Sequence, residues 1–120
     1  MQLTKKQIDL LNRRKNVVLT TASLQGKPRS IFVEVNQVKD DKIVITDNVM
    51  VTTRKNLLEN KQVALLVFEE DYSYCLEISG RAEYHTTGGY FDFVRGLETN
   101  KNYSPKGAVV VIVEEVIEVK

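Results

Sequence analysis

The stretch from Tyr74 to Tyr84 constrains the fold of this chain more than any other, because its side chains alternate in polarity. The apolar or aromatic positions are Tyr74, Leu76, Ile78, Ala82 and Tyr84, and the polar positions between them are Glu77, Ser79, Arg81 and Glu83. A period of two residues is typical of a β-strand with one buried face and one wet face. Gly80 interrupts the pattern, which predicts a bulge or a close approach of another backbone.

Five further segments have the composition of strands, and turn residues separate them. β-Branched and other apolar residues dominate segments 17–22, 31–38, 43–45, 63–68 and 108–119. Turn chemistry at 25–28 and at 39–41 joins the first three segments into a meander. The near-continuous apolar character of 63–68 predicts a buried strand.

Three short helices are expected between these strands. Thr4 followed by Gln7 forms a capping-box pattern, which predicts an amphipathic helix at the start of the chain. A second helix is expected from a cap at Thr52 or Thr53, and a third begins at 87–89. The order is therefore helix, three strands, helix, two strands, helix and strand. Six antiparallel strands in one domain of residues 1–120 are best closed into a small barrel, because closure removes exposed edges.

The last expected strand is apolar on both faces in its first half, from 108 to 113. A strand covered on both sides is unusual in a chain of 120 residues. We therefore expect another copy of the chain to supply one of the covers, which predicts a homodimer.

Charge and composition exclude several classes of protein. The 17 basic and 16 acidic residues nearly balance, so the chain lacks the sustained basic field of nucleic-acid-binding proteins, although its first half is basic and favours a small anionic ligand. The longest apolar run, 108–113, is too short to span a membrane. The polar amino terminus is not a secretory signal, and the lone Cys75 agrees with a reducing compartment. We expect a cytoplasmic protein with no membrane or nucleic-acid partner.

The sequence offers little for catalysis by side chains alone. His85 is the only histidine and the acidic residues are dispersed, so no metal site is expected. The chain contains no nucleophile elbow, no G-x-G-x-x-G and no Walker sequence. No residue has the pattern of a general acid or base, and the catalytic residues stay unknown.

The segment 43–57 has the pattern of a phosphate site. An apolar strand ends in Thr46, Asp47 and Asn48, and after a short loop a helix begins with Thr52, Thr53, Arg54 and Lys55. Free backbone N–H groups, hydroxyls and cations at a helix start bind anions. The alternative is an ordinary capped helix with solvated basic residues. This helix is expected to run to Lys61, with Leu57 and Leu58 facing inward.

The order of elements and several short motifs resemble the pyridoxamine 5′-phosphate oxidase-like family of FMN-binding split barrels, over nearly the whole chain. The motifs are 17–22, 26–30, 43–48, Thr53 with 56–60, 63–66 and 78–82. The resemblance implies a mainly β (α+β) fold, a six-stranded antiparallel Greek-key split β-barrel with short flanking helices. It also implies FMN, or a deazaflavin in its place, bound at a homodimer interface.

The resemblance carries the site over by position. The family holds the FMN phosphate with a Lys or Arg and a Ser or Thr, which fall here on Thr52 and Thr53, so Arg54 or Lys55 would have to supply the cation. The flavin ring would lie against Ile31, Phe32, Val33 and Glu34, with polar contacts from Thr46, Asp47 and Asn48 and an aromatic cover near Tyr103. Tyr103 packing on its own subunit is the alternative.

Two functions are compatible with these residues. The first is an FMN-binding flavoprotein that acts as an oxidoreductase or electron-transfer protein, with an unknown small-molecule substrate or electron partner. The second is a non-enzymatic split-barrel binding protein that has lost the flavin, for which the missing cation at Thr52 is the main support.

Overall fold

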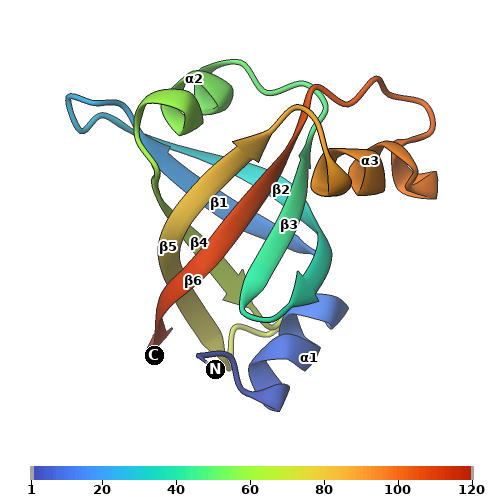
Figure 1. The fold of residues 1–120 in the computed structure, drawn as a ribbon. Helices are drawn as coiled ribbons and strands as arrows, with labels where there is room; N and C mark the ends of the chain where they lie inside the picture. The colour runs from blue at the N-terminus through green and yellow to red at the C-terminus, as the bar shows by residue number, and fades with distance from the viewer. Residues whose placement is uncertain (1, 120) are drawn as a thin grey trace.

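A computed structural model describes residues 2–119, and its six strands form a closed antiparallel barrel (Figure 1). The strands are β1 (Asn16–Ala22), β2 (Pro28–Lys39), β3 (Lys42–Asp47), β4 (Gln62–Phe68), β5 (Cys75–His85) and β6 (Gly107–Val119). Their order around the barrel is β1-β2-β3-β6-β5-β4, so β4 returns to pair with β1 rather than with β3. The helices are α1 (Lys5–Arg13), α2 (Thr52–Glu59), α3 (Gly89–Arg95) and the 3-10 helix η1 (Glu98–Asn100). The expected six-stranded barrel with short helices is confirmed.

The long alternating strand is β5, and its pattern has the predicted cause. Leu76, Ile78 and Ala82 are buried inside the barrel, and β5 pairs with β4 on one side and β6 on the other. The register between β5 and β6 shifts at Gly80, where a Cβ atom would lie 2.1 Å from the Ile112 carbonyl oxygen. Only glycine permits this approach, so the predicted bulge is confirmed.

Two predicted details of burial are wrong. β4 is not buried on both faces, because Leu65 points into the core while Leu66 on the outer face is 36% exposed. In α2, Leu57 is buried but Leu58 is exposed, and the helix ends at Glu59 rather than at Lys61. Both errors arise because apolar character alone does not distinguish a core position from an uncovered outer face.

The outer face of β3 and β6 is covered by α3 of the same chain. Val94 of α3 forms a second apolar cluster with Val44, Ala108 and Val110, and aromatic side chains of α3 pack around it. Figure 1 shows α3 lying beside these strands outside the barrel. The argument that a second copy must cover the segment 108–113 is therefore wrong, since every residue of it except the half-buried Ile112 is buried within one chain.

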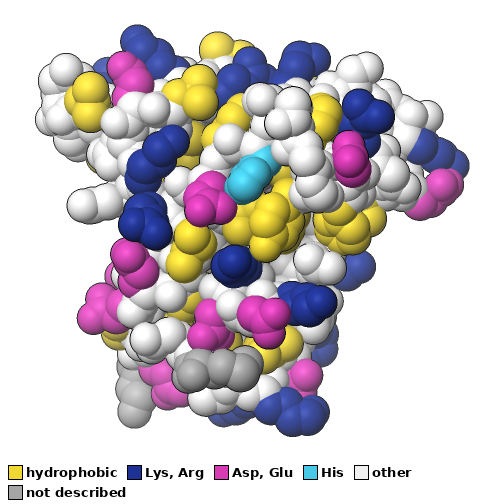
Figure 2. Space-filling model, viewed as in Figure 1, with side chains coloured by type: hydrophobic (Ala, Val, Ile, Leu, Met, Phe, Trp, Pro, Cys, Tyr) yellow, Lys and Arg dark blue, Asp and Glu magenta, His cyan; other side chains and the backbone are white. Residues whose placement is uncertain are grey.

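Mixed charge covers the face shown in Figure 2, where apolar side chains reach the surface around the single histidine. That histidine, His85, lies beside Tyr90 of α3 with ring centroids 5.2 Å apart, and its Nε2 is 3.0 Å from Glu83 Oε1. His85 thus has local partners at the end of β5.

Among residues 2–119, no helix is long and apolar enough to cross a membrane.

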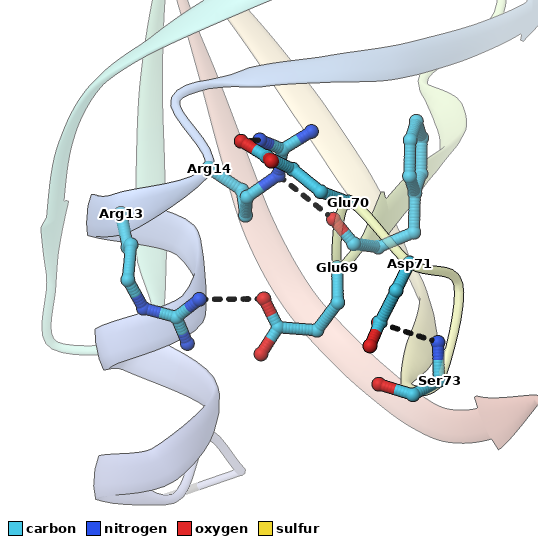
Figure 3. A network of polar contacts seen from close by, with 7 residues as sticks. Arg13, Arg14, Glu69, Glu70, Asp71 and Ser73 are labelled. Atoms are coloured by element: carbon cyan, nitrogen blue, oxygen red, sulfur yellow. Dashed lines mark hydrogen bonds and ion pairs between the residues drawn. The ribbon is translucent and has the colours of Figure 1, made fainter.

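The first helix closes the other end of the barrel. Thr4 Oγ1 accepts from Gln7 N and Gln7 Oε1 accepts from Thr4 N, so the predicted capping box is present. At the carboxyl end of α1, Arg14 Nε donates to the Phe68 carbonyl at 3.0 Å (Figure 3). The same figure shows Arg13 paired with Glu69 of the β4–β5 loop. The polar side chains at this end of the barrel are therefore paired with one another and with the backbone.

Candidate functional site

A cavity of about 560 Å³ lies against β2 and β3, below the start of α2 and beside η1. Its volume is in the range of small-molecule and cofactor sites. Nine of the predicted site residues line it: Ile31, Phe32, Val33, Glu34, Thr46, Asn48, Thr52, Thr53 and Tyr103. Asp47, Arg54 and Lys55 do not. The lining residues that were not predicted are Arg29, Asn36, Val49, Met50, Val51, Thr99 and Asn100.

The β2 wall of the cavity is the outer face of the barrel. Val33 is buried in the core and Ile31 packs against it, so the residues between and beside them point outward. Phe32 is 76% exposed, and the Glu34 carboxylate accepts a long hydrogen bond of 3.4 Å from the Thr99 hydroxyl. This strand therefore offers its backbone, an aromatic ring and one carboxylate to the cavity.

The start of α2 lies at another wall of the cavity and has no side-chain cap. The capping position is Val51, and Thr52 and Thr53 are the first helical residues rather than caps. The first hydrogen bond of the helix runs from Lys55 N to the Val51 carbonyl, which leaves the preceding N–H groups without partners within the helix. These groups and the helix dipole make a positive helix end. The predicted cap by Thr52 or Thr53 is wrong.

Asp47 lies on the opposite side of β3 from the cavity and is completely buried. Its carboxylate accepts from Met50 N at 2.9 Å, from the Tyr84 hydroxyl at 2.6 Å and from both Nε and Nη2 of Arg54. The ion pair with Asp47 raises the pKa of Arg54, and burial, followed by the bond to Asp47, raises the pKa of Tyr84 to about 12. Asp47 thus fixes the β3–α2 loop and keeps Arg54 out of the cavity.

Arg29 is the basic residue among those that line the cavity. It is the second residue of β2 and is exposed. Lys55 is exposed too, but it lies on α2 away from the cavity wall. The signal that could have found Arg29 was its place in the 26–30 motif, directly before the strand expected to contact the ring.

A chain of hydrogen bonds between amide and hydroxyl side chains forms the polar wall near η1. Asn48 Nδ2 donates to Asn100 Oδ1 at 3.1 Å. Asn100 Nδ2 donates to the Val94 carbonyl at 2.8 Å and to Thr46 Oγ1 at 2.9 Å. The Thr46 hydroxyl donates to Asn36 Oδ1 at 2.7 Å. Asn48 Oδ1 is buried and accepts no bond from the described residues.

Tyr103 lines the cavity of its own chain and is 55% exposed. Its backbone N–H donates to the Asn100 carbonyl at 3.0 Å, which attaches this loop to η1. Within residues 2–119, no three His, Cys, Asp or Glu side chains lie close enough to hold a metal ion together. The cavity therefore offers hydrogen bonds, apolar surface and one cation.

Comparison with known proteins gives the relatives of this chain. A family model described as pyridoxamine 5′-phosphate oxidase matches residues 3–120. The uncharacterized protein MJ0282 of Methanocaldococcus jannaschii is 32% identical over an alignment of 126 positions, which covers 100% of this chain and 83% of that protein.

Two solved structures show a shared fold at low identity. An FMN-binding protein from Syntrophomonas wolfei subsp. wolfei has a TM-score of 0.80 and 19% identity, and the match covers 94% of this chain and 83% of that one. HutZ, a heme-storage protein from Vibrio cholerae, has a TM-score of 0.71 and 13% identity, with coverage of 98% and 94%.

Proposed function

The chain belongs to the pyridoxamine 5′-phosphate oxidase family, and from this we propose that it is an FMN-binding flavoprotein. The observation that carries the proposal is the cavity itself. It joins an uncapped helix start to an outward-facing strand and a polar wall, and FMN has the matching order of phosphate, ring and polar ring edge. The similar fold of an FMN-binding protein supports the same assignment.

The phosphate end of the proposed site is the start of α2. The free N–H groups, Thr52 and Thr53 would bind the phosphate, and Arg29 would supply the cation in place of Arg54, which Asp47 already binds. A charge-assisted hydrogen bond of this kind contributes about 1.5–3 kcal/mol. Arg29, at the start of β2, would thus compensate for the missing cation at Thr52.

The ring end fits the remaining residues. Phe32, Val49 and Val51 form an apolar rim at the cavity, each more than three-quarters exposed at 76%, 77% and 79%. The buried Asn48 Oδ1 lacks a donor, and the ring N–H of a flavin is a donor that would satisfy it. Burial of an unpaired acceptor costs about 1–3 kcal/mol, so a ligand that removes this cost gains affinity.

The bound flavin would supply hydride or electron transfer, and the residues of the chain would hold and orient it. We propose an oxidoreductase or electron-transfer role with a small molecule as substrate, in a cytoplasmic protein of one domain. Tyr103, which is 55% exposed, and the half-buried Glu34 both line the cavity, where a substrate would meet them. Neither residue is assigned a catalytic step.

A second copy of the chain would close the open side of the site. The exposed Phe32 continues an outer apolar row across the barrel, since its register partner on β1 is Val18 and the partner of Val18 on β4 is Leu66. Apolar side chains that lie together on the surface in this way are typical of interaction sites. We therefore propose a homodimer with the cavity at its interface.

The test is binding of FMN to the purified chain. We expect flavin absorbance in the isolated protein, or quenching of FMN fluorescence on titration, with FMN bound at least about tenfold more tightly than riboflavin because of its phosphate. Arg29→Ala together with Thr53→Ala should weaken FMN binding about a hundredfold and leave riboflavin binding nearly unchanged.

Lys55→Ala is the matched control, because it removes a charge from the same helix outside the cavity. Equal binding of FMN by the double variant and the parent would place the phosphate elsewhere. Failure of the parent to bind FMN would favour the non-enzymatic binding protein. A titration with heme would then test whether this barrel binds heme, since HutZ is a heme-storage protein.

A further inference from the structure

Asn36 owes its position to an irregularity in β2. Val35 pairs with Ile45 and Gln37 pairs with Val44, so Asn36 is an extra residue opposite β3. A bulge of this kind redirects a side chain and is frequent beside functional sites. Here it places Asn36 on the cavity wall, with its Oδ1 on the Thr46 hydroxyl.

The carbonyl of Val94 sets the direction of the whole hydrogen-bond chain. A backbone carbonyl only accepts, so the Asn100 amide must direct Nδ2 toward it, and Oδ1 then faces Asn48. Asn48 must in turn present Nδ2 to that oxygen. The Val94 carbonyl therefore fixes the orientation of the Asn100 amide, and Asn100 fixes that of Asn48. This branch ends at Asn48 Oδ1, an acceptor without a partner among the described residues.

The other branch of the hydrogen-bond chain, through Thr46 and Asn36, ends in a donor. Thr46 Oγ1 accepts from Asn100 Nδ2, and its only hydrogen is used on Asn36 Oδ1. In the structure the Asn36 amide faces Thr46 with Oδ1, which gives the Thr46 hydrogen an acceptor, and its Nδ2 points away from Thr46. Within the described residues, Asn36 Nδ2 makes no hydrogen bond, and it is not among the buried unpaired atoms.

We propose that Asn36 is a specificity-determining donor of this cavity, oriented through Thr46 and Asn100 by the Val94 carbonyl. It selects a ligand that places a hydrogen-bond acceptor, such as a ring carbonyl, at β2 and rejects one that places an N–H there. This inference rests on the proposed function, in which the acceptor belongs to the flavin ring. Asn48 Oδ1, at the other end of the hydrogen-bond chain, would accept from a ring N–H.

The ligand test replaces Asn36 in two ways. Asn36→Leu keeps the approximate size and removes the donor, and Asn36→Asp keeps the shape but presents only acceptors and a charge. We expect FMN to bind about tenfold more weakly to Asn36→Leu and weaker still to Asn36→Asp. Gln37→Glu is the matched control, because it adds a charge at the next residue, outside this cavity, and should change the Kd by less than about twofold.

Unchanged FMN affinity in Asn36→Leu, with thermal unfolding showing a folded protein, would overturn the proposal. A second measurement needs neither ligand nor variant. In the parent, the two side-chain amide protons of Asn100 are both bonded and should exchange with water at least about tenfold more slowly than those of Asn36, followed by NMR. Protected Asn36 protons would show the reverse orientation and overturn the proposal.

The two readouts separate the two proposals. The parent could show the expected amide exchange and yet bind no FMN. That result would contradict the flavoprotein proposal and the flavin ring as the ligand of Asn36, while supporting the direction of the hydrogen bonds. Normal FMN binding that Asn36→Leu does not change would contradict Asn36 as a determinant and leave the flavoprotein standing.

Discussion

At the scale of single residues, the carboxylate of Asp47 is stable in the barrel end only because several groups donate to it. Arg54, Tyr84 and the Met50 N–H come from different segments, so the one carboxylate joins α2, β5 and the loop between β3 and α2. A buried charge that loses a partner is costly, since the remaining group stays desolvated and unpaired. Asp47 therefore stabilises the position of the α2 start without touching the cavity.

We expect Tyr84→Phe to lower the free energy of unfolding by about 1.5–3 kcal/mol at pH 7, because it removes a hydrogen bond to a buried charge. The pKa of Tyr84 is about 12 in the folded chain and about 10 when unfolded. Its contribution is therefore complete below pH 10 and is lost as the pH rises toward 12. The difference between parent and variant in urea unfolding should shrink over that range. A difference that stays constant to pH 12 would contradict the assignment.

The residue types of the site could be predicted from the sequence better than their partners. Thr46 reaches the cavity while Asp47 does not, because alternate residues of a strand face opposite ways, and Asn48 reaches it from the bend directly after β3. The sequence made Arg54 a candidate for the phosphate cation, but in the structure its guanidinium is paired with Asp47. Arg29 depends on the β2 strand beginning earlier than 31, at Pro28, which its turn-like sequence did not indicate.

At the scale of elements, β5 and β6 approach each other closely at Gly80, where their register shifts. A methyl group there would meet the Ile112 carbonyl oxygen at 2.1 Å, and backbone on both sides prevents an easy shift. We expect Gly80→Ala to lower the free energy of unfolding by about 3 kcal/mol or more, measured by urea denaturation. Gly89→Ala is the control, because its Cβ meets nothing within 4 Å and alanine favours the helix. Equal stability of the two variants would contradict the close approach.

The third helix shows where element patterns stop being informative. Its existence follows from the sequence after 87–89, and its aromatic residues indicate that it packs on something. The apolar faces of 108–113 likewise indicate two covers, but neither pattern says that the two belong together. The contact between Val94 and Val110 joins them, and it removes the need for a second copy at this face.

At the scale of the whole molecule, the proposed dimer depends on the opposite surface, around Phe32. We expect the parent to sediment at micromolar concentration as 27.4 kDa, twice 13.7 kDa, and Phe32→Glu to sediment as a monomer with nearly unchanged thermal stability. Leu24→Glu is the control, since Leu24 is also exposed, at 64%, but lies in the turn between β1 and β2. A monomeric parent, or a dimeric Phe32→Glu, would exclude this interface.

The barrel as a whole was predictable because six antiparallel strands in a small chain leave few ways to avoid free edges. The identity of the closing pairs was not, since nothing in the local patterns links β1 to β4 or β3 to β6. Those pairings depend on α2 and α3, which carry the chain across the barrel ends. They also create the cavity, which lies where α2 and η1 meet β2 and β3.

Closure of the ring also sets the pace at which the chain reaches its native state. Val18 meets Leu66 and Lys42 meets Ile112 only after long stretches of chain have been brought together. The entropy of closing such loops is lost before the pairing repays it, and topologies dominated by distant contacts fold in milliseconds to seconds rather than microseconds. A nascent chain would expose the edges of β1 and β3 until β4 and β6 emerge, so this barrel depends on its last strand to become resistant to aggregation.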